Sequence, residues 1–260
     1  MTNQSIDGGH EFDWGKASRD YARYRDIYPP EFYEKILSMG FCTEGQKILD
    51  IGTGTGVIPR NMAKYGARFI GADISENQIK YAEKLTKQSG LDIKYIVSSA
   101  EELDLPVKSF DAVTACQCFY YYDPKRLFPK IHSLLKNNGH FLIMFMEWLY
   151  FESDIVRHSD AIIKKYNPFW SGSEHENVTY PIPSSANGLF KVESNETFRV
   201  DLTFTREGWN GRMKCCRGVG AEMPPEKIKK WEKEHMEYLD TLPKRFVIPH
   251  HIVFADLKKI

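Results

Sequence analysis

The sequence carries no excess of charge of either sign, because 35 Lys and Arg residues balance 35 Asp and Glu residues. It therefore lacks the overall positive charge on which most nucleic-acid binding depends. It also lacks a long hydrophobic run: residues 141–151 form the longest, Glu147 interrupts it, and it is too short to cross roughly 30 Å of hydrocarbon. The first 15 residues show no signal-peptide pattern. We therefore expect a soluble cytoplasmic protein that binds neither nucleic acid nor a membrane.

Cysteine is scarce, and none of the five residues stands in a Cys-x-x-Cys pair. Cys215 and Cys216 are adjacent, and neighbours in the chain rarely form an unstrained disulfide. No four ligands follow a zinc spacing. The sequence predicts five reduced thiols and no metal site.

Hydrophobic composition fits a globular chain of one domain. Apolar residues make up 42% and aromatic residues 13% of the 260 positions, which excludes an intrinsically disordered chain. Short apolar runs, which predict strands, alternate with helical patterns. The expected strands are 47–51, 68–74, 92–98, 110–116 and 141–146, and the expected helices are 57–65, 76–88 and 124–139, the last one ending at Asn138-Gly139. This alternation predicts a doubly wound α/β fold with right-handed crossovers.

The second half of the chain is less regular. We read Tyr150–Asn187 as an irregular insertion that covers the carboxyl edge of the sheet. A strand over 198–205, a charged amphipathic helix over 224–238 and a strand over 246–255 follow it. We expect a single domain composed of an N-terminal arm (1–36), a cofactor-binding core (37–149), a cap insertion (150–190) and a C-terminal part that completes the sheet (191–260).

A glycine-rich loop follows the first expected strand, with the sequence Ile48-Leu-Asp-Ile-Gly-Thr-Gly-Thr-Gly56. A dinucleotide fingerprint needs a third small residue where Val57 or Pro59 stands, and no Gly-Lys-Ser/Thr follows as in a P-loop. Asp50 would repel a pyrophosphate but suits a cationic amino-acid group. A nucleotide-dependent oxidoreductase is therefore disfavoured.

Asp73 ends the second expected strand, 21 residues after Gly52. A carboxylate at this place can accept two hydrogen bonds from a ribose diol. The alternative role of Asp73 is to cap the next helix. Because Ser75 can perform that role, we favour the ribose contact.

Four segments, in this order, resemble the class I S-adenosylmethionine-dependent methyltransferases. They are Tyr21–Pro29, Asp50–Gly56, Gly71–Ser75, and Ser99–Pro106 with Ser109–Asp111. The resemblance is to the small-molecule branch that includes the ubiquinone/menaquinone and trans-aconitate methyltransferases. It implies a seven-stranded, mostly parallel Rossmann-like sheet, S-adenosylmethionine as methyl donor and a small-molecule acceptor. No Asn/Asp-Pro-Pro-Tyr or Pro-Cys motif follows the fourth strand, which disfavours methylation of nucleic-acid bases.

The resemblance also implies which residues bind the cofactor. Asp50 would lie near its ammonium group or orient the loop, Asp73 would hold the ribose, and Ile74 would flank the adenine. Tyr24 and Arg25 would close over the cofactor carboxylate. By position, the cofactor-binding residues are Tyr24, Arg25, Asp50, Gly52, Thr53, Gly54, Asp73, Ile74, Gln78, Ala100, Glu101, Cys116 and Gln117.

No residue is singled out as catalytic, because methyl transfer needs alignment more than a catalytic group. Candidates on the acceptor side are Tyr120, Glu147 and Arg212, although an aromatic residue here is as readily part of the core and Glu147 a solvated loop residue. Arg212, Lys214 and Arg217 form a basic cluster that suggests an anionic acceptor. A non-catalytic S-adenosylmethionine-binding module remains the alternative from another class, and either a monomer or a homodimer fits.

Overall fold

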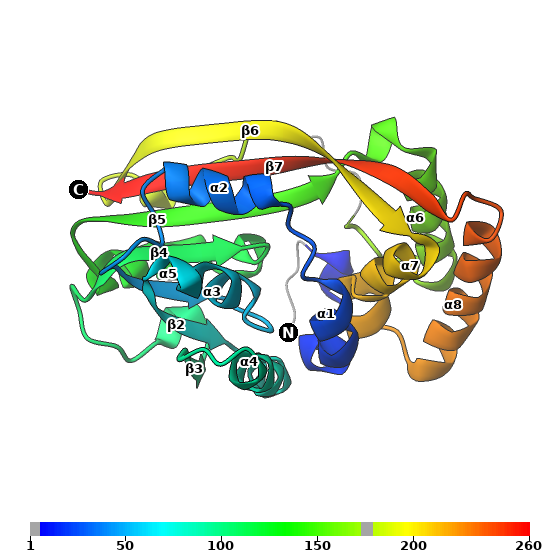
Figure 1. Cartoon of the computed structure of the whole chain (residues 1–260), viewed down its shortest axis with the longest axis horizontal. Helices are drawn as coiled ribbons and strands as arrows, with labels where there is room; N and C mark the ends of the chain where they lie inside the picture. Colours follow the sequence, from blue (N-terminus) through cyan, green and yellow to red (C-terminus); the bar gives the residue numbers. More distant parts are fainter. Residues whose placement is uncertain (1–5, 173–178) are drawn as a thin grey trace. The chain divides into compact units, whose positions relative to one another are not determined.

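The computed structural model describes residues 6–172 and 179–260 of the chain. Its strands form one seven-stranded sheet in the order β3-β2-β1-β4-β5-β7-β6 (Figure 1). The strands are β1 (Lys47–Ile51), β2 (Arg68–Asp73), β3 (Lys94–Val97), β4 (Phe110–Cys116), β5 (Leu135–Trp148), β6 (Phe190–Thr205) and β7 (Arg245–Lys259). All seven include or match a run that the sequence marked as a strand, so the alternating pattern is confirmed.

The first five strands are parallel. β1 pairs with β2 and β4, β2 also pairs with β3, and β4 also pairs with β5. β7 runs opposite to β5 (Figure 1). The carboxyl ends of β1, β2 and β4 therefore meet at one edge, which is where open α/β sheets bind ligands. The predicted doubly wound, mostly parallel sheet is confirmed.

Helices connect and flank these strands. They are α1 (Ser18–Tyr24), α2 (Pro30–Ser38), α3 (Val57–Met62), α4 (Glu76–Gln88), α5 (Pro124–Leu134), α6 (Asp154–Tyr166), α7 (Arg206–Lys214) and α8 (Pro225–Leu239). Side-chain caps explain where two of them begin: Ser75 accepts from the backbone N–H of Gln78, and Asp123 accepts from that of Lys125. No helix within the described residues is long and apolar enough to cross a membrane.

Helix α5 is shorter than predicted. It ends at Leu134, and β5 begins at Leu135, which already pairs with Phe110 of β4. The predicted stop, Asn138-Gly139, lies inside β5, where the pairing with β4 is interrupted by a bulge and Asn138 has a φ of 60°. An Asn-Gly pair readily forms a left-handed bend, and such a bend occurs both at the end of a helix and in a bulge. The pair therefore correctly predicted a bend at this place, but the prediction that the bend ends a helix is wrong.

The segment after β5 is more regular than predicted. We expected Tyr150–Asn187 to be irregular, but its first part forms the short helix Tyr150–Glu152 and then α6. The Ser153 hydroxyl accepts from the backbone N–H of Val156, and Val156 and Ile163 are buried on one face. A serine cap followed by apolar residues at helical spacing is a readable signal that the sequence analysis missed.

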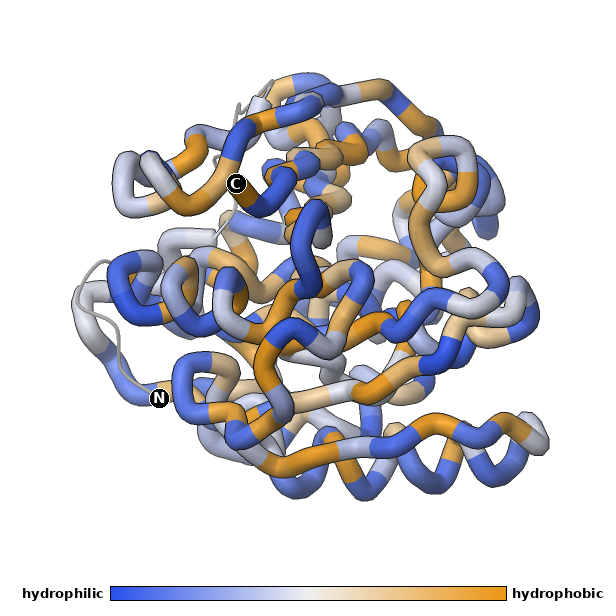
Figure 2. The backbone as a smooth tube through the Cα atoms, turned by 90° about the vertical axis from the view of Figure 1, so that its left-hand side faces the viewer, coloured by the Kyte–Doolittle hydropathy of each residue, from blue (hydrophilic) through white to orange (hydrophobic). Residues whose placement is uncertain are grey.

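The chain divides into two compact units. The sheet unit comprises Tyr28–Met146, Val178–Phe198 and Ile252–Ile260, and the helical unit comprises Met1–Ile27, Glu147–Asn177 and Arg199–His251. Each has its own apolar core, with Phe141 and Leu49 in the sheet unit and Trp209 and Trp231 in the helical unit. Hydrophobic and hydrophilic positions alternate along the backbone, as in elements that bury one face (Figure 2). The expectation of a single domain with four parts stays a prediction.

Candidate functional site

The loop between β1 and α3 bends at three glycines. Gly52, Gly54 and Gly56 have φ values of 59°, 56° and 75°, a region that glycine adopts without strain. The backbone N–H of Thr53 donates to the carbonyl of Ala72 at 2.9 Å, which ties the loop to the end of β2. The glycine loop is therefore a fixed turn at the carboxyl edge of the sheet.

A side chain at Gly52 has no room, for a reason that the sequence did not reveal. A Cβ atom there would lie 2.6 Å from Cβ of Cys118 and 2.7 Å from the hydroxyl of Tyr122. Burial raises the pKa of both the Cys118 thiol and the Tyr122 hydroxyl well above their usual values. The chain's own side chains fill the space beside Gly52, so the contact that Gly52 offers a ligand is its backbone.

Asp73 joins the glycine loop to the start of α4. Its Oδ2 accepts from the backbone N–H of Gly54 at 2.9 Å, and its Oδ1 accepts from that of Ser75 at 2.8 Å. Ser75 in turn caps α4 by accepting from the N–H of Gln78 at 3.3 Å. Ser75 is thus the cap, as predicted, and each Asp73 oxygen keeps a lone pair for a ligand hydroxyl.

Asp50 is a second carboxylate beside the loop; it is buried, 2% exposed, and its Oδ1 accepts from the Thr114 hydroxyl at 2.6 Å. Burial raises its pKa to about 7; the hydrogen bond from Thr114 opposes the shift, and the charge of Asp73 adds to it. Asp73 is partly buried, and desolvation raises its pKa as well. Within the described residues, no Lys, Arg or His forms an ion pair with either carboxylate. Two carboxylates shielded from water without a cation favour a cationic ligand.

Asp50 is expected to make the stability of the ligand-free protein depend on pH. Because its pKa is higher in the folded than in the unfolded chain, the folded state binds more protons between these values, and stability falls as pH rises from about 4 to about 7. Asp50→Asn removes this contribution, since Asn still accepts from Thr114. Urea unfolding at pH 5 and pH 8 measures it: the variant should gain stability over wild type at pH 8 and not at pH 5. An equal difference at both pH values would contradict the assignment.

Two exposed apolar side chains lie beside Asp73. Ile74 follows Asp73 directly and is 48% exposed, and Val97, the register partner of Asp73 at the end of β3, is 50% exposed. Together they give the edge an apolar face next to a carboxylate, which suits an aromatic ring attached to a sugar. Ile74 is among the predicted adenine contacts. Val97 was missed, because strand pairing alone places it there.

Three further predicted cofactor-binding residues are Gln78, Ala100 and Glu101. Ala100 is buried at the start of the short helix after β3, and Gln78 is buried in the first turn of α4. Glu101 accepts from the backbone N–H of Asp123 at 3.2 Å, one residue before α5. Gln78 thus follows β2, and Ala100 and Glu101 follow β3; their cofactor role stays a prediction.

Cys116 is the last residue of β4, and Gln117 follows it. The Cys116 thiol donates to the Tyr28 hydroxyl at 3.2 Å, and the Gln117 side chain donates to the carbonyl of Met146. Gln117 has a φ of 60°, so the chain turns sharply here despite a full side chain. Such strain is typical of binding sites, where the surrounding structure holds it.

The first acceptor candidates occupy different environments. Tyr120 is 38% exposed and stacks on Phe145 at 5.5 Å between ring centres, and Phe145 stacks in turn on Tyr180 at 4.8 Å. Tyr120 is therefore the open end of an aromatic stack in the sheet unit. Glu147 is half-buried near the end of β5 and belongs to the helical unit.

The predicted contacts from the N-terminal arm lie in the helical unit. Tyr24 donates to Glu207 at 3.0 Å, and its ring covers Gly211 so closely that a Cβ atom there would lie 2.4 Å away. Arg25 is buried, with its guanidinium 5.0 Å from the centre of the Tyr21 ring. Tyr24 thus packs against α7, and a cofactor role for either residue stays a prediction.

The basic cluster separates into groups with different partners. Lys214 pairs with Glu232 at 3.1 Å, and buried Arg217 forms an ion pair with buried Asp7. Neither Lys214 nor Arg217 is therefore available to a ligand anion, contrary to our expectation of a shared basic site. Sequence spacing placed the three cations together, but the acids that neutralise two of them come from distant segments.

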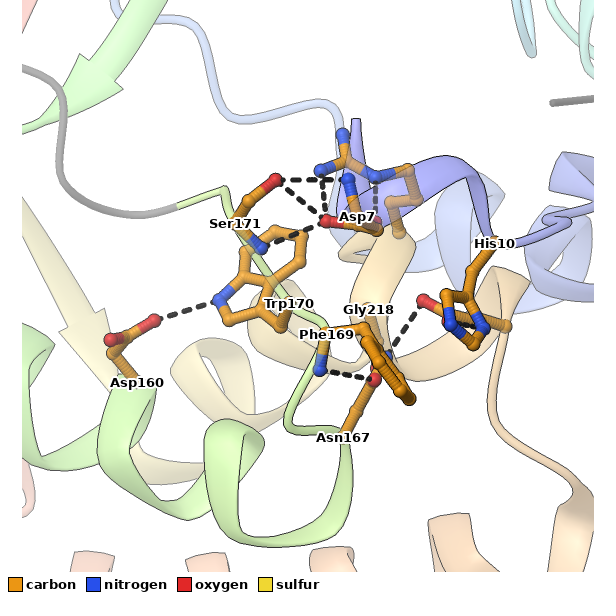
Figure 3. Close-up of polar contacts among 10 residues, drawn as sticks. Asp7, His10, Asp160, Asn167, Phe169, Trp170, Ser171 and Gly218 are labelled. Atoms are coloured by element: carbon orange, nitrogen blue, oxygen red, sulfur yellow. Dashed lines mark hydrogen bonds and ion pairs between the residues drawn. The ribbon is translucent and has the colours of Figure 1, made fainter. Parts of the chain in front are cut away.

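Asp7 is held on several sides. Ser171 donates to Oδ1 of Asp7 from its backbone N–H and from its hydroxyl, both at 2.8 Å (Figure 3). The neighbouring Trp170 donates from its ring to Asp160 at 2.7 Å. Residues far apart in the sequence are thereby fixed to one another within the helical unit.

Two residues that shape the loop gave no readable signal in the sequence. Thr114 is the partner of Asp50, and Tyr95 fills the space where Gly56 and Gly71 lack side chains: a Cβ atom would lie 2.4 Å or 2.7 Å from it. The Tyr95 hydroxyl bonds that of Thr86 at 2.8 Å. Only the strand register brings these residues under the glycine loop.

Comparisons with known proteins agree with this geometry. Residues 49–143 match the methyltransferase domain family. A methyltransferase of Dictyostelium discoideum is 32% identical over 57% of this chain and 52% of its own length. An S-adenosylmethionine-dependent methyltransferase of Saccharomyces cerevisiae is 29% identical over 59% of this chain and 52% of its own length. A ubiquinone biosynthesis O-methyltransferase of Cereibacter sphaeroides is 35% identical over 41% of this chain and 44% of its own length. The chain thus spans about half the length of the curated relatives it matches.

The fold is also found among solved structures. A methyltransferase from Bacillus halodurans superposes with a TM-score of 0.55 and 17% identity, over 87% of this chain and 98% of that one. At this identity the likeness concerns the fold, and it extends beyond the matched domain. Together, these matches show that residues 49–143 of the chain are similar to a methyltransferase domain and that the chain shares the fold of a methyltransferase.

Proposed function

We propose that the protein transfers a methyl group from S-adenosylmethionine to a small-molecule acceptor and releases S-adenosylhomocysteine. The observation that carries this proposal is the pair of carboxylates beside the glycine loop, buried Asp50 and partly buried Asp73, neither of which forms an ion pair with a cation of the described chain. S-adenosylmethionine is positively charged at its sulfur and at its amino group. Two carboxylates attract such a molecule and repel a dinucleotide pyrophosphate.

Each residue of the loop edge has a defined part in this proposal. Asp73 accepts the ribose hydroxyls with its remaining lone pairs, and Ile74 and Val97 cover one face of the adenine. The bound cofactor supplies an electrophilic methyl group. Aligning it with the acceptor and excluding water contributes up to ~7–11 kcal/mol in favourable cases, so a metal or a catalytic dyad is not required.

The acceptor is a small organic molecule in this proposal. The ubiquinone biosynthesis relative, by its name, belongs to small-molecule metabolism, and the zero net charge of this chain disfavours a nucleic acid. Tyr120 offers an aromatic face to an acceptor or to the sulfonium. We propose that the protein works in the cytoplasm, as a monomer or homodimer, on an acceptor with an anionic group.

Calorimetric titration with S-adenosylmethionine, S-adenosylhomocysteine and NAD tests the proposal. We expect the first two to bind and NAD not to bind; binding of NAD alone would favour an oxidoreductase. An acceptor screen that detects S-adenosylhomocysteine release then separates an enzyme from a non-catalytic binding module. Cofactor binding without turnover across phenols, amines and carboxylic acids would favour the module.

A further inference from the structure

Two guanidinium groups are buried close together in the helical unit. Arg25 follows α1 and is 9% exposed, and Arg212 on α7 is 6% exposed. The Arg212 guanidinium carbon lies 4.8 Å from the centre of the Trp148 ring, and its Nη1 lies 3.4 Å from Sγ of Cys216. Burial lowers the pKa of Arg212, and the positive charge of Arg25 lowers it further. The two cations therefore repel each other in a buried environment.

In the part of the chain that the structure describes, Arg212 has no acid to balance its charge. Among residues 6–172 and 179–260, no carboxylate forms an ion pair with Arg212, and its Nε is buried without a hydrogen-bond partner. Arg217, five residues later, is equally buried but is neutralised by Asp7. A buried cation without an anion lowers stability, so its presence indicates a use other than holding the fold.

A buried acceptor faces the same charges. Nδ1 of His250 lies 2.9 Å from the carbonyl of Ile248, so this nitrogen carries the proton and donates. Burial lowers the pKa of His250 to about 3, and the charges of Arg212 and Arg25 contribute, so the ring is neutral at physiological pH. Its Nε2 is then a buried acceptor, and it has no partner within the described residues. An unpaired donor and an unpaired acceptor are thus found in one small region.

We propose that Arg212, with Arg25 beside it, binds the carboxylate of a small-molecule ligand, and that His250 accepts a hydrogen bond from the same ligand. A guanidinium matches a carboxylate with two parallel hydrogen bonds, and the Trp148 ring holds its plane in place. This inference rests on the proposed function, because the carboxylate belongs either to the methyl acceptor or to the amino-acid part of the cofactor. Arg212 is then a binding residue.

The stability of three variants separates a binding role from a structural one. Arg212→Met removes an unbalanced cation and keeps the apolar volume against Trp148, so we expect its melting temperature without ligand to rise. Arg217→Met should melt at a lower temperature, because it leaves Asp7 unpaired. Arg206→Met removes a partly exposed ion pair with Asp240 at the start of α7 and should change little. A fall for Arg212→Met as large as that for Arg217→Met would overturn the proposal.

Ligand titration identifies the source of the carboxylate. Wild type and Arg212→Met are titrated with S-adenosylhomocysteine, with 5′-methylthioadenosine, which lacks the amino-acid carboxylate, and with succinate and benzoate. We expect Arg212→Met to bind one class of carboxylate about 10- to 100-fold more weakly. A loss for S-adenosylhomocysteine alone assigns the carboxylate to the cofactor, and a loss for the free acids alone assigns it to the acceptor.

Two outcomes of these titrations would each overturn one of the proposals. Equal affinities of wild type and Arg212→Met for all four compounds would overturn the inference. Failure of wild type to bind S-adenosylhomocysteine would overturn the proposed function, and the free acids would still test Arg212. Arg212→Lys keeps the charge but loses the forked geometry, so its affinity for the carboxylate should lie between the other two.

Discussion

Replacing Asp73 with alanine is expected to weaken S-adenosylhomocysteine binding by about 100-fold or more. Two hydrogen bonds from a ribose to a carboxylate that the ligand shields from water contribute about 1.5–3 kcal/mol each, and each 1.4 kcal/mol is about a factor of ten. The loss also frees the backbone N–H of Gly54, so the glycine loop is less firmly held. Calorimetric titration of wild type and variant at the same pH measures the effect.

A second ligand separates the ribose contact from the loop contact. Wild type should bind the 2′-deoxy analogue of S-adenosylhomocysteine at least about tenfold more weakly than the parent, and Asp73→Ala should bind both equally. Ser75→Ala is the matched control: it removes the α4 cap, lowers stability by about 0.5–2 kcal/mol and should leave affinity unchanged. If Asp73→Ala still discriminates between the two ligands, the ribose assignment is wrong.

Arg217→Met is expected to lower the free energy of unfolding by about 3–5 kcal/mol, because it leaves the Asp7 carboxylate buried without its cation. At about 2–4 °C per kcal/mol, the melting temperature should fall by about 10 °C. Urea unfolding and thermal melting measure the loss. The double variant Asp7→Asn with Arg217→Met removes the stranded charge, so it should be more stable than Arg217→Met alone; equal or lower stability would contradict the ion-pair explanation.

The same pair gives a pH dependence with a defined sign. Burial raises the pKa of Asp7, but the hydrogen bonds and charge of Arg217, with help from Ser171, lower it more, so the net pKa lies below its usual value of 3.8. Its stabilising contribution is complete above that value and is lost as pH falls through the folded-state pKa. In Arg217→Met the carboxyl protonates at a higher pH, which relieves the penalty. The stability difference between wild type and variant should therefore be largest near pH 7 and shrink toward pH 3.

Much of the sheet unit was predictable because its signals are local. The Gly52–Gly56 loop, the carboxylates of Asp50 and Asp73, and the Ser75 cap are each defined by residue type and spacing within a few positions. Apolar runs of strand length, separated by helices of regular period, predicted the parallel strands in the same way. The pairing and burial of these strands follow from the order of strands and helices along the chain.

Other features depended on residues that meet only in the folded chain. Local sequence predicted a turn at Asn138-Gly139, but pairing between β4 and β5 made it a bulge inside a strand. Spacing also placed Arg212 and Arg217 in one basic cluster. The fold separated their roles, because Asp7, 210 positions away, neutralises Arg217 and no described acid reaches Arg212. A cation's availability to a ligand depends on its distance to every acid in the molecule. The sequence by itself therefore determined the glycine loop and its carboxylates, and the tertiary structure decided which cations remain for a ligand.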